Sequence, residues 1–123
     1  FKIIEINSTK TKKNNAIEIK KIESENILKN IKKNDLLFLL DEKGKNYDSR
    51  EFAEFLKIKF QESKTIVFVI GGAFGFSKDL YSKSVGLISL SKMTFSHQII
   101  RLFFTEQLYR AFTILNNHPY HND

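Results

Sequence analysis

The chain has 123 residues, 41% of them hydrophobic and 28% charged, which suits a single domain with one substantial core. It contains no cysteine, which excludes disulfides and thiolate zinc sites, and no apolar run is long enough to cross a membrane or to act as a signal peptide. The net charge of +6 suits a partner such as nucleic acid, and we expect a cytoplasmic protein that needs neither a metal nor a membrane.

The first third predicts a strand, a loop, a helix and a second strand. Phe1–Ile6 is a short apolar run typical of a strand, and Ser8–Asn15 is polar and basic, as loops are. Ala16–Lys33 is charged, but its apolar residues recur with helical spacing. Leu36–Leu40 is continuously apolar, which is expected of a strand buried on both faces.

A loop, a second helix and a third strand follow. Asp41–Tyr47 is expected to be a loop. Asp48 stands three residues before Glu51, the spacing of a capping box, and so marks the start of a helix. Thr65–Ile70 is apolar and rich in β-branched residues, which predicts a buried strand. The buried stripe predicted for the helix is Phe52, Phe55, Leu56 and Phe60.

The remaining chain continues the alternation. Gly71–Ser77 predicts a turn, and Ser77–Ser84 a short helix with Ser77 as its cap. Val85–Ser89 is a further strand, and Ser96–Leu115 is a long helix that ends before Pro119. Strands that alternate with helices predict an α/β fold whose parallel sheet is flanked by helices on both faces. General rules of chain connection predict that this topology is unknotted.

The glycine-rich turn permits three interpretations. Gly71-Gly72-x-x-Gly75 follows a strand and precedes a helix, where glycine lets the backbone approach a ligand. It matches neither the dinucleotide fingerprint nor a phosphate-binding loop, which makes a nucleotide-binding domain improbable. A plain strand-to-helix turn is an equally good explanation from these residues alone.

The long final helix carries polar residues on an otherwise apolar sequence. His97, Arg101 and Thr105 recur every four residues and share one face, whereas Glu106 and Arg110 have the spacing of a helical ion pair. An alternative for His97 is that it does no more than cap its own helix. An alternative for Tyr109 is that it belongs to the hydrophobic core. Apolar residues occupy nearly every side of this helix, so we expect a second subunit to cover part of it.

The excess positive charge does not by itself identify a partner. Residues 1–34 hold nine lysines and four glutamates, so most of the excess lies there. Only three of the twenty basic residues are arginine, and lysine is common throughout the chain. The charge therefore fits RNA binding and a general compositional preference for lysine equally well.

Five short motifs of this chain stand in the same order and at roughly the same spacing as in a known family. Together they resemble the ribosomal large-subunit methyltransferase H family, the 23S rRNA pseudouridine N3-methyltransferases of the SPOUT class. The motifs are Leu40-Asp41-x-x-Gly44-Lys45, Ile70-Gly71-Gly72-x-x-Gly75, Leu90-Ser91-x-Met93-Thr94-Phe95-x-His97-Gln98, Glu106-Gln107-x-Tyr109-Arg110-Ala111 and Asn117-His118-Pro119-Tyr120-His121.

The resemblance implies a single SPOUT domain over residues 1–123 with a C-terminal trefoil knot that binds S-adenosylmethionine. The family's first strand–helix unit has no counterpart in this chain. A supporting role near the cofactor is plausible for Lys45. The cofactor contacts that the resemblance implies are Leu40, Gly71, Leu90, Ser91, Lys92, Met93, Thr94 and Phe95.

The same resemblance implies methyl transfer to N3 of a pseudouridine in 23S rRNA of the assembled ribosome, by a homodimer. Ser96 replaces the family's usual proline before the histidine. His97, His118 and His121 are candidate bases because histidine titrates near neutral pH. The expected catalytic residues are His97, Arg101, Tyr109 and His118, and the expected RNA contacts are Arg110, Tyr120 and His121. The competing interpretation is a basic α/β protein that binds RNA without catalysis.

Overall fold

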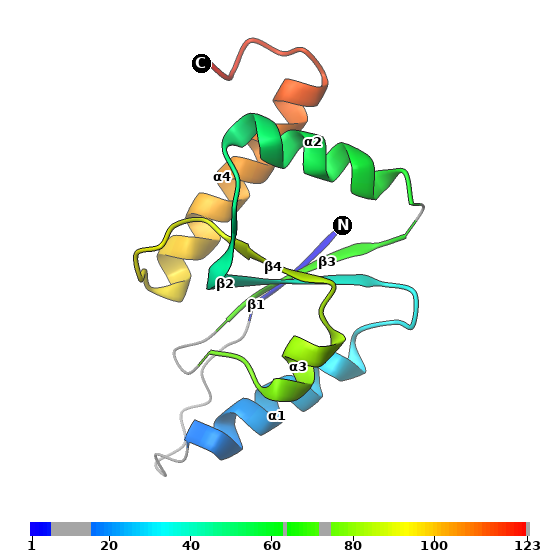
Figure 1. The fold of residues 1–123 in the computed structure, drawn as a ribbon, viewed down its shortest axis with the longest axis vertical. Coiled ribbons are helices and arrows are strands. Elements are labelled where there is room, and N and C mark those ends of the chain that lie inside the picture. Colours follow the sequence, from blue (N-terminus) through cyan, green and yellow to red (C-terminus); the bar gives the residue numbers. More distant parts are fainter. Residues whose placement is uncertain (6–15, 63, 72–74, 123) are drawn as a thin grey trace.

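A computed structural model describes residues 1–5, 16–62, 64–71 and 75–122, with the backbone alone for residues 16–20, and shows helices on both faces of a sheet (Figure 1). The sheet has four parallel strands in the order β1-β3-β2-β4. The strands are β1 (Lys2–Glu5), β2 (Leu36–Asn46), β3 (Ile66–Ile70) and β4 (Gly86–Ser89). The predicted α/β class is therefore confirmed.

Two helices cover each face of this sheet. Helices α2 (Ser49–Phe60) and α4 (His97–Leu115) pack on one face, and α1 (Ala16–Lys29) and α3 (Lys78–Lys83) lie on the other (Figure 1). Phe68 of β3 points to the first face, where its ring lies 4.8 Å from that of Phe104. Val67 and Val69 point to the second face, toward Ile27 and Leu80. This division explains why the strand sequences are continuously apolar.

Side-chain caps begin three of the helices. The Asp48 carboxylate accepts a hydrogen bond from the Glu51 N–H at 2.7 Å, and the Glu51 carboxylate accepts one from the Asp48 N–H at 2.9 Å. The hydroxyls of Ser77 and Ser96 cap α3 and α4 in the same way. The predicted capping box and the Ser77 cap are thus confirmed, and the cap of α4 is Ser96 rather than His97.

The second strand is longer than predicted. β2 continues through Asn46, so the expectation of a loop over Asp41–Tyr47 is wrong for most of its length. Its pairing with β4 is interrupted after Leu40 and resumes at Lys45. Gly44 makes this possible, since a Cβ there would lie 2.6 Å from the carbonyl carbon of Leu87. The polar residues of the second half of β2 are typical of a loop, but backbone pairing with β4 holds them in a strand.

Two smaller expectations are also wrong. Helix α1 ends at Lys29, four residues early, because the Asp35 carboxylate accepts a hydrogen bond from the Lys32 N–H in a turn. Phe60 is not buried with the stripe of α2, since 36% of its surface is exposed. Ile6, the predicted loop Ser8–Asn15 and the centre of the glycine-rich turn lie outside the described residues. The trefoil knot stays a prediction.

Candidate active site

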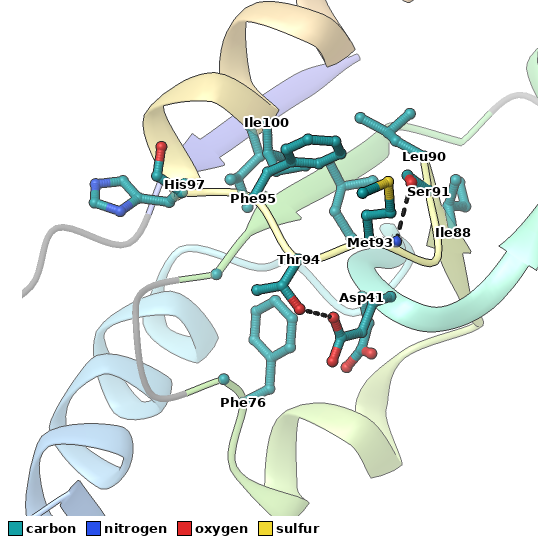
Figure 2. Close-up of a pocket in the computed structure, with 16 residues that line it drawn as sticks. Asp41, Phe76, Ile88, Leu90, Ser91, Met93, Thr94, Phe95, His97 and Ile100 are labelled. Carbon is teal, nitrogen blue, oxygen red and sulfur yellow. Dashed lines mark hydrogen bonds between the residues drawn. The ribbon is translucent and has the colours of Figure 1, made fainter.

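A pocket of about 550 Å³ opens at the carboxyl ends of β3 and β4, next to the point where β2 leaves its pairing with β4 after Leu40. Carboxyl ends of parallel strands are the usual ligand site of open α/β sheets. The middle of β2, the ends of β3 and β4, the segments after β3 and β4 and the start of α4 supply the lining, and Figure 2 shows Phe76 and Thr94 facing one another. The described lining residues are Leu40, Asp41, Glu42, Ile70, Gly71, Gly75, Phe76, Ile88, Leu90, Ser91, Met93, Thr94, Phe95, Ser96, His97 and Ile100.

Most of the expected cofactor contacts lie around this single pocket. They come from three segments distant in sequence, namely Leu40 within β2, Gly71 after β3 and the loop after β4. Seven of the eight expected residues line it, and the exception is Lys92, whose side chain is exposed to solvent. The structure thus brings together residues that the sequence could only associate by resemblance.

The loop after β4 is held in place by short-range hydrogen bonds. The Ser89 hydroxyl donates to the Ser91 carbonyl at 2.8 Å, and the Met93 N–H donates to the Ser91 hydroxyl at 3.0 Å. Thr94 fixes the far end of the loop, because its hydroxyl donates to the Glu42 carboxylate at 2.7 Å (Figure 2). This last hydrogen bond joins the loop to the wall of the pocket that β2 forms.

Several lining residues were not among the expected contacts. Asp41 and Glu42 were assigned to a solvated turn, and Phe76 and Ile100 were not considered for the site. The motif around Asp41 was a usable signal for the first of these. The position of Phe76 depends on the packing of α3, which no local pattern reveals. Lys45 does not line the pocket, and its ammonium lies 5.1 Å from the centre of the Tyr47 ring.

The Asp41 carboxylate is surrounded by neutral donors. It accepts hydrogen bonds from the Lys43 N–H at 2.8 Å and from the Tyr81 hydroxyl at 2.5 Å. Burial of Tyr81, together with its hydrogen bond to Asp41, raises the pKa of that phenol to about 12. The phenol therefore remains a donor throughout the neutral range.

The four expected catalytic residues do not form one cluster within the chain. His97 lines the pocket, whereas the Arg101 guanidinium turns away and pairs with the Glu5 carboxylate at 3.2 Å. Tyr109 and His118 are exposed near the end of α4, and neither lines the pocket.

The expected RNA-contacting residues instead form a cluster of their own at the end of α4. Arg110 makes two hydrogen bonds to the Glu106 carboxylate, at 2.6 and 3.0 Å, which confirms the ion pair considered from the sequence. Its guanidinium also lies 3.0 Å from a ring nitrogen of His121 and 4.9 Å from the centre of the Tyr120 ring. The Tyr120 ring contacts that of Tyr109 edge-on at 4.8 Å. These contacts order the chain after α4.

A second pocket of about 440 Å³ adjoins the first. It lies between the start of α2 and the middle of α4 and shares Ile88, Leu90, Ser91 and Phe95 with the first pocket. Phe103 lines it from α4.

Within the described parts of the chain, no group of three or more histidine and acidic side chains is placed to hold a metal ion. The helices described there are too short or too polar to cross a membrane.

Comparison with known proteins places the chain in one family. Residues 1–121 match the family model described as "Predicted SPOUT methyltransferase". A protein of Flavobacterium psychrophilum is 58% identical over 104 residues, 84% of this chain and 66% of that protein. A protein of Christiangramia forsetii is 51% identical over 114 residues, 92% of this chain and 73% of that protein. Both are named "Ribosomal RNA large subunit methyltransferase H", and the chain spans about two thirds to three quarters of their lengths. The chain belongs to the SPOUT methyltransferase family.

Proposed function

We propose that this chain is the catalytic domain of an S-adenosylmethionine-dependent methyltransferase that acts on large-subunit rRNA. Its target would be N3 of a pseudouridine in 23S rRNA, modified on the assembled ribosome in the cytoplasm. The observation that carries the proposal is that Leu40 of β2 and the segments after β3 and β4, with Gly71 and Leu90, converge on one pocket. The names of the relatives support rRNA as the substrate.

The residues around the pocket fit S-adenosylmethionine. Its volume of about 550 Å³ lies in the range typical of small-molecule sites. Apolar side chains such as Leu90 and Ile100 can enclose an adenine ring, while the exposed backbone of the loop after β4 offers donors and acceptors to its edge. Gly71 lets this wall approach a ligand closely. When bound, the cofactor supplies an electrophilic methyl group on a sulfonium.

The chain's contribution to the reaction is positioning and proton removal. N3 would have to lose its proton as it accepts the methyl group that the bound cofactor would supply, so the chain must hold N3 in place and take up that proton. His97 is the histidine of the described pocket lining, and we assign it the role of accepting that proton, directly or through water. In-line alignment of the acceptor with the methyl group supplies much of the rate.

The acceptor RNA would be held by the cluster at the end of α4, in a dimer. Tyr109 and Tyr120 expose ring surface on which bases can stack. The Arg110 guanidinium can contact phosphate. Because this cluster and His97 stand at opposite ends of α4, a second subunit is the simplest way to bring both to one site.

Calorimetric titration with S-adenosylmethionine, with NAD as the control ligand, tests the cofactor. We expect selective binding of about one molecule per subunit. A folded protein that binds neither ligand would reject the methyltransferase and favour the RNA-binding alternative.

The target is tested by mass spectrometry of rRNA from cells that contain or lack the protein. The full-length protein should be used, since relatives are longer than this chain. We expect N3-methylpseudouridine to disappear from 23S rRNA when the protein is absent. An unchanged amount of N3-methylpseudouridine would reject this target, and the assignment of the cofactor would be unaffected.

A further inference from the structure

The pocket has a local charge opposite to that of the protein. The sequence carries a net charge of +6, yet the charged side chains among the described lining residues are the carboxylates of Asp41 and Glu42. His97 is the other titratable group there, and no lysine or arginine lines the pocket within the described part of the chain.

Neither carboxylate is neutralised by a cation within the described residues. Asp41 accepts hydrogen bonds from the Lys43 N–H and the Tyr81 hydroxyl, and Glu42 accepts one from the Thr94 hydroxyl. These donors are neutral, so they orient the two carboxylates and leave their charge in place. The ion pairs of the described chain involve other acidic residues.

We propose that Asp41 and Glu42 make the pocket discriminate between the methyl donor and its product. The inference rests on the function proposed above. S-adenosylmethionine has a cationic sulfonium, and S-adenosylhomocysteine has a neutral thioether at the same position. Both molecules carry the same ammonium and carboxylate groups, so two uncompensated carboxylates favour the donor through the additional positive charge of its sulfonium. The transfer itself thereby removes a favourable interaction and speeds product release.

Glu42 allows this to be tested without disturbing the fold, because its side chain is exposed. Calorimetry would compare the two ligands in the wild type, Glu42→Gln and Asp41→Asn. We expect the wild type to bind S-adenosylmethionine about tenfold more tightly than S-adenosylhomocysteine. In each variant the affinity for S-adenosylmethionine should fall about fivefold, while the affinity for S-adenosylhomocysteine stays unchanged. Raising the salt concentration should reduce the preference in the wild type.

Two further variants separate local charge from other effects. Glu54→Gln removes one negative charge from an exposed site on α2 outside the pocket and should leave the preference unchanged. Thr94→Val removes the hydrogen bond but keeps the Glu42 charge, so it should weaken both ligands alike.

Three results would overturn the inference: equal affinities in the wild type, an equal loss of both ligands in Glu42→Gln, or the same effect in Glu54→Gln. Absence of binding by both ligands has a different meaning, since it would reject the proposed cofactor itself.

Discussion

Gly71 has no room for a side chain on the wall of the pocket. A Cβ there would lie 2.8 Å from the tip of the Phe76 ring. The ring can rotate or shift, and since it lines the pocket, its movement should change the shape of the ligand site more than the stability of the fold.

We therefore expect Gly71→Ala to weaken S-adenosylmethionine binding by roughly tenfold, the cost of a displaced contact wall. Gly86→Ala is the matched control, because a Cβ at that position would meet Phe38 at 3.4 Å, close to ordinary contact. Calorimetry and thermal unfolding of both variants check this. Equal affinities in the two variants would show that the Phe76 wall does not contact the ligand.

Glu23 is a second residue in an unusual environment. It is 5% exposed, and neither of its carboxylate oxygens has a hydrogen-bond partner among the described residues. Burial raises the pKa of this carboxyl group, because the charged form is desolvated. The folded state therefore binds a proton more readily than the unfolded chain, and stability falls as pH rises through the raised pKa.

Replacing Glu23 with methionine should raise the free energy of unfolding at neutral pH by about 1–3 kcal/mol, the usual cost of a buried polar group without a partner. The advantage should shrink as pH falls and the wild-type carboxyl group becomes protonated. Urea unfolding at neutral and acidic pH measures both effects. A destabilised variant at neutral pH would mean that the carboxylate has a favourable partner in solution.

At the scale of elements, Arg110 joins the end of α4 to the chain that follows it. Its guanidinium contacts Glu106 on the helix and Tyr120 and His121 beyond it. The contact with Tyr120 is a cation–π interaction, which lysine at the same position would reproduce less well.

Arg110→Ala should accelerate amide hydrogen exchange over residues 117–122, with a smaller effect in Arg110→Lys. Arg101→Ala is the control, since its partner is Glu5 on β1 and its loss should leave those amides unchanged. Exchange rates at 117–122 that match the wild type in Arg110→Ala would show that other contacts order this segment.

Elements with a local signal were predictable from the sequence. The capping box at Asp48, the Ser77 cap and the apolar runs of β2 and β3 predicted the element types correctly, and for α2, α3 and β3 they also predicted nearly correct boundaries. The second half of β2 was not predictable, because its polar residues are held by pairing with β4 rather than by burial. For the same reason Asp41 and Glu42 were expected in a loop, although they lie in β2 and line the pocket, Glu42 with an exposed side chain.

At the scale of the whole molecule, α4 leaves a wide apolar surface uncovered. Leu102 is 67% exposed, and Ile99 and Phe103 are also exposed along the same helix. Contiguous exposed apolar side chains usually mark an interface. This arrangement agrees with the expectation of a homodimer through α4.

Leu102→Glu should raise the dimer dissociation constant by at least about tenfold, because a desolvated charge without a partner is costly in an interface. Val85→Glu, at an exposed apolar residue just before β4, is the control and should leave the dimer intact. Light scattering across a concentration series measures both. A wild-type protein that stays monomeric at micromolar concentration would reject the dimer.

The interruption in β2 determines which side of the pocket can move. The chain leaves its pairing with Ile88 at Leu40 and returns to the same residue at Lys45. The segment between Leu40 and Lys45, which carries both pocket carboxylates, therefore forms a bulge whose two ends are paired with the same residue of β4. Opening it would break backbone pairing, so we expect conformational adjustment to a ligand to take place in the opposite wall, Ser91–Ser96.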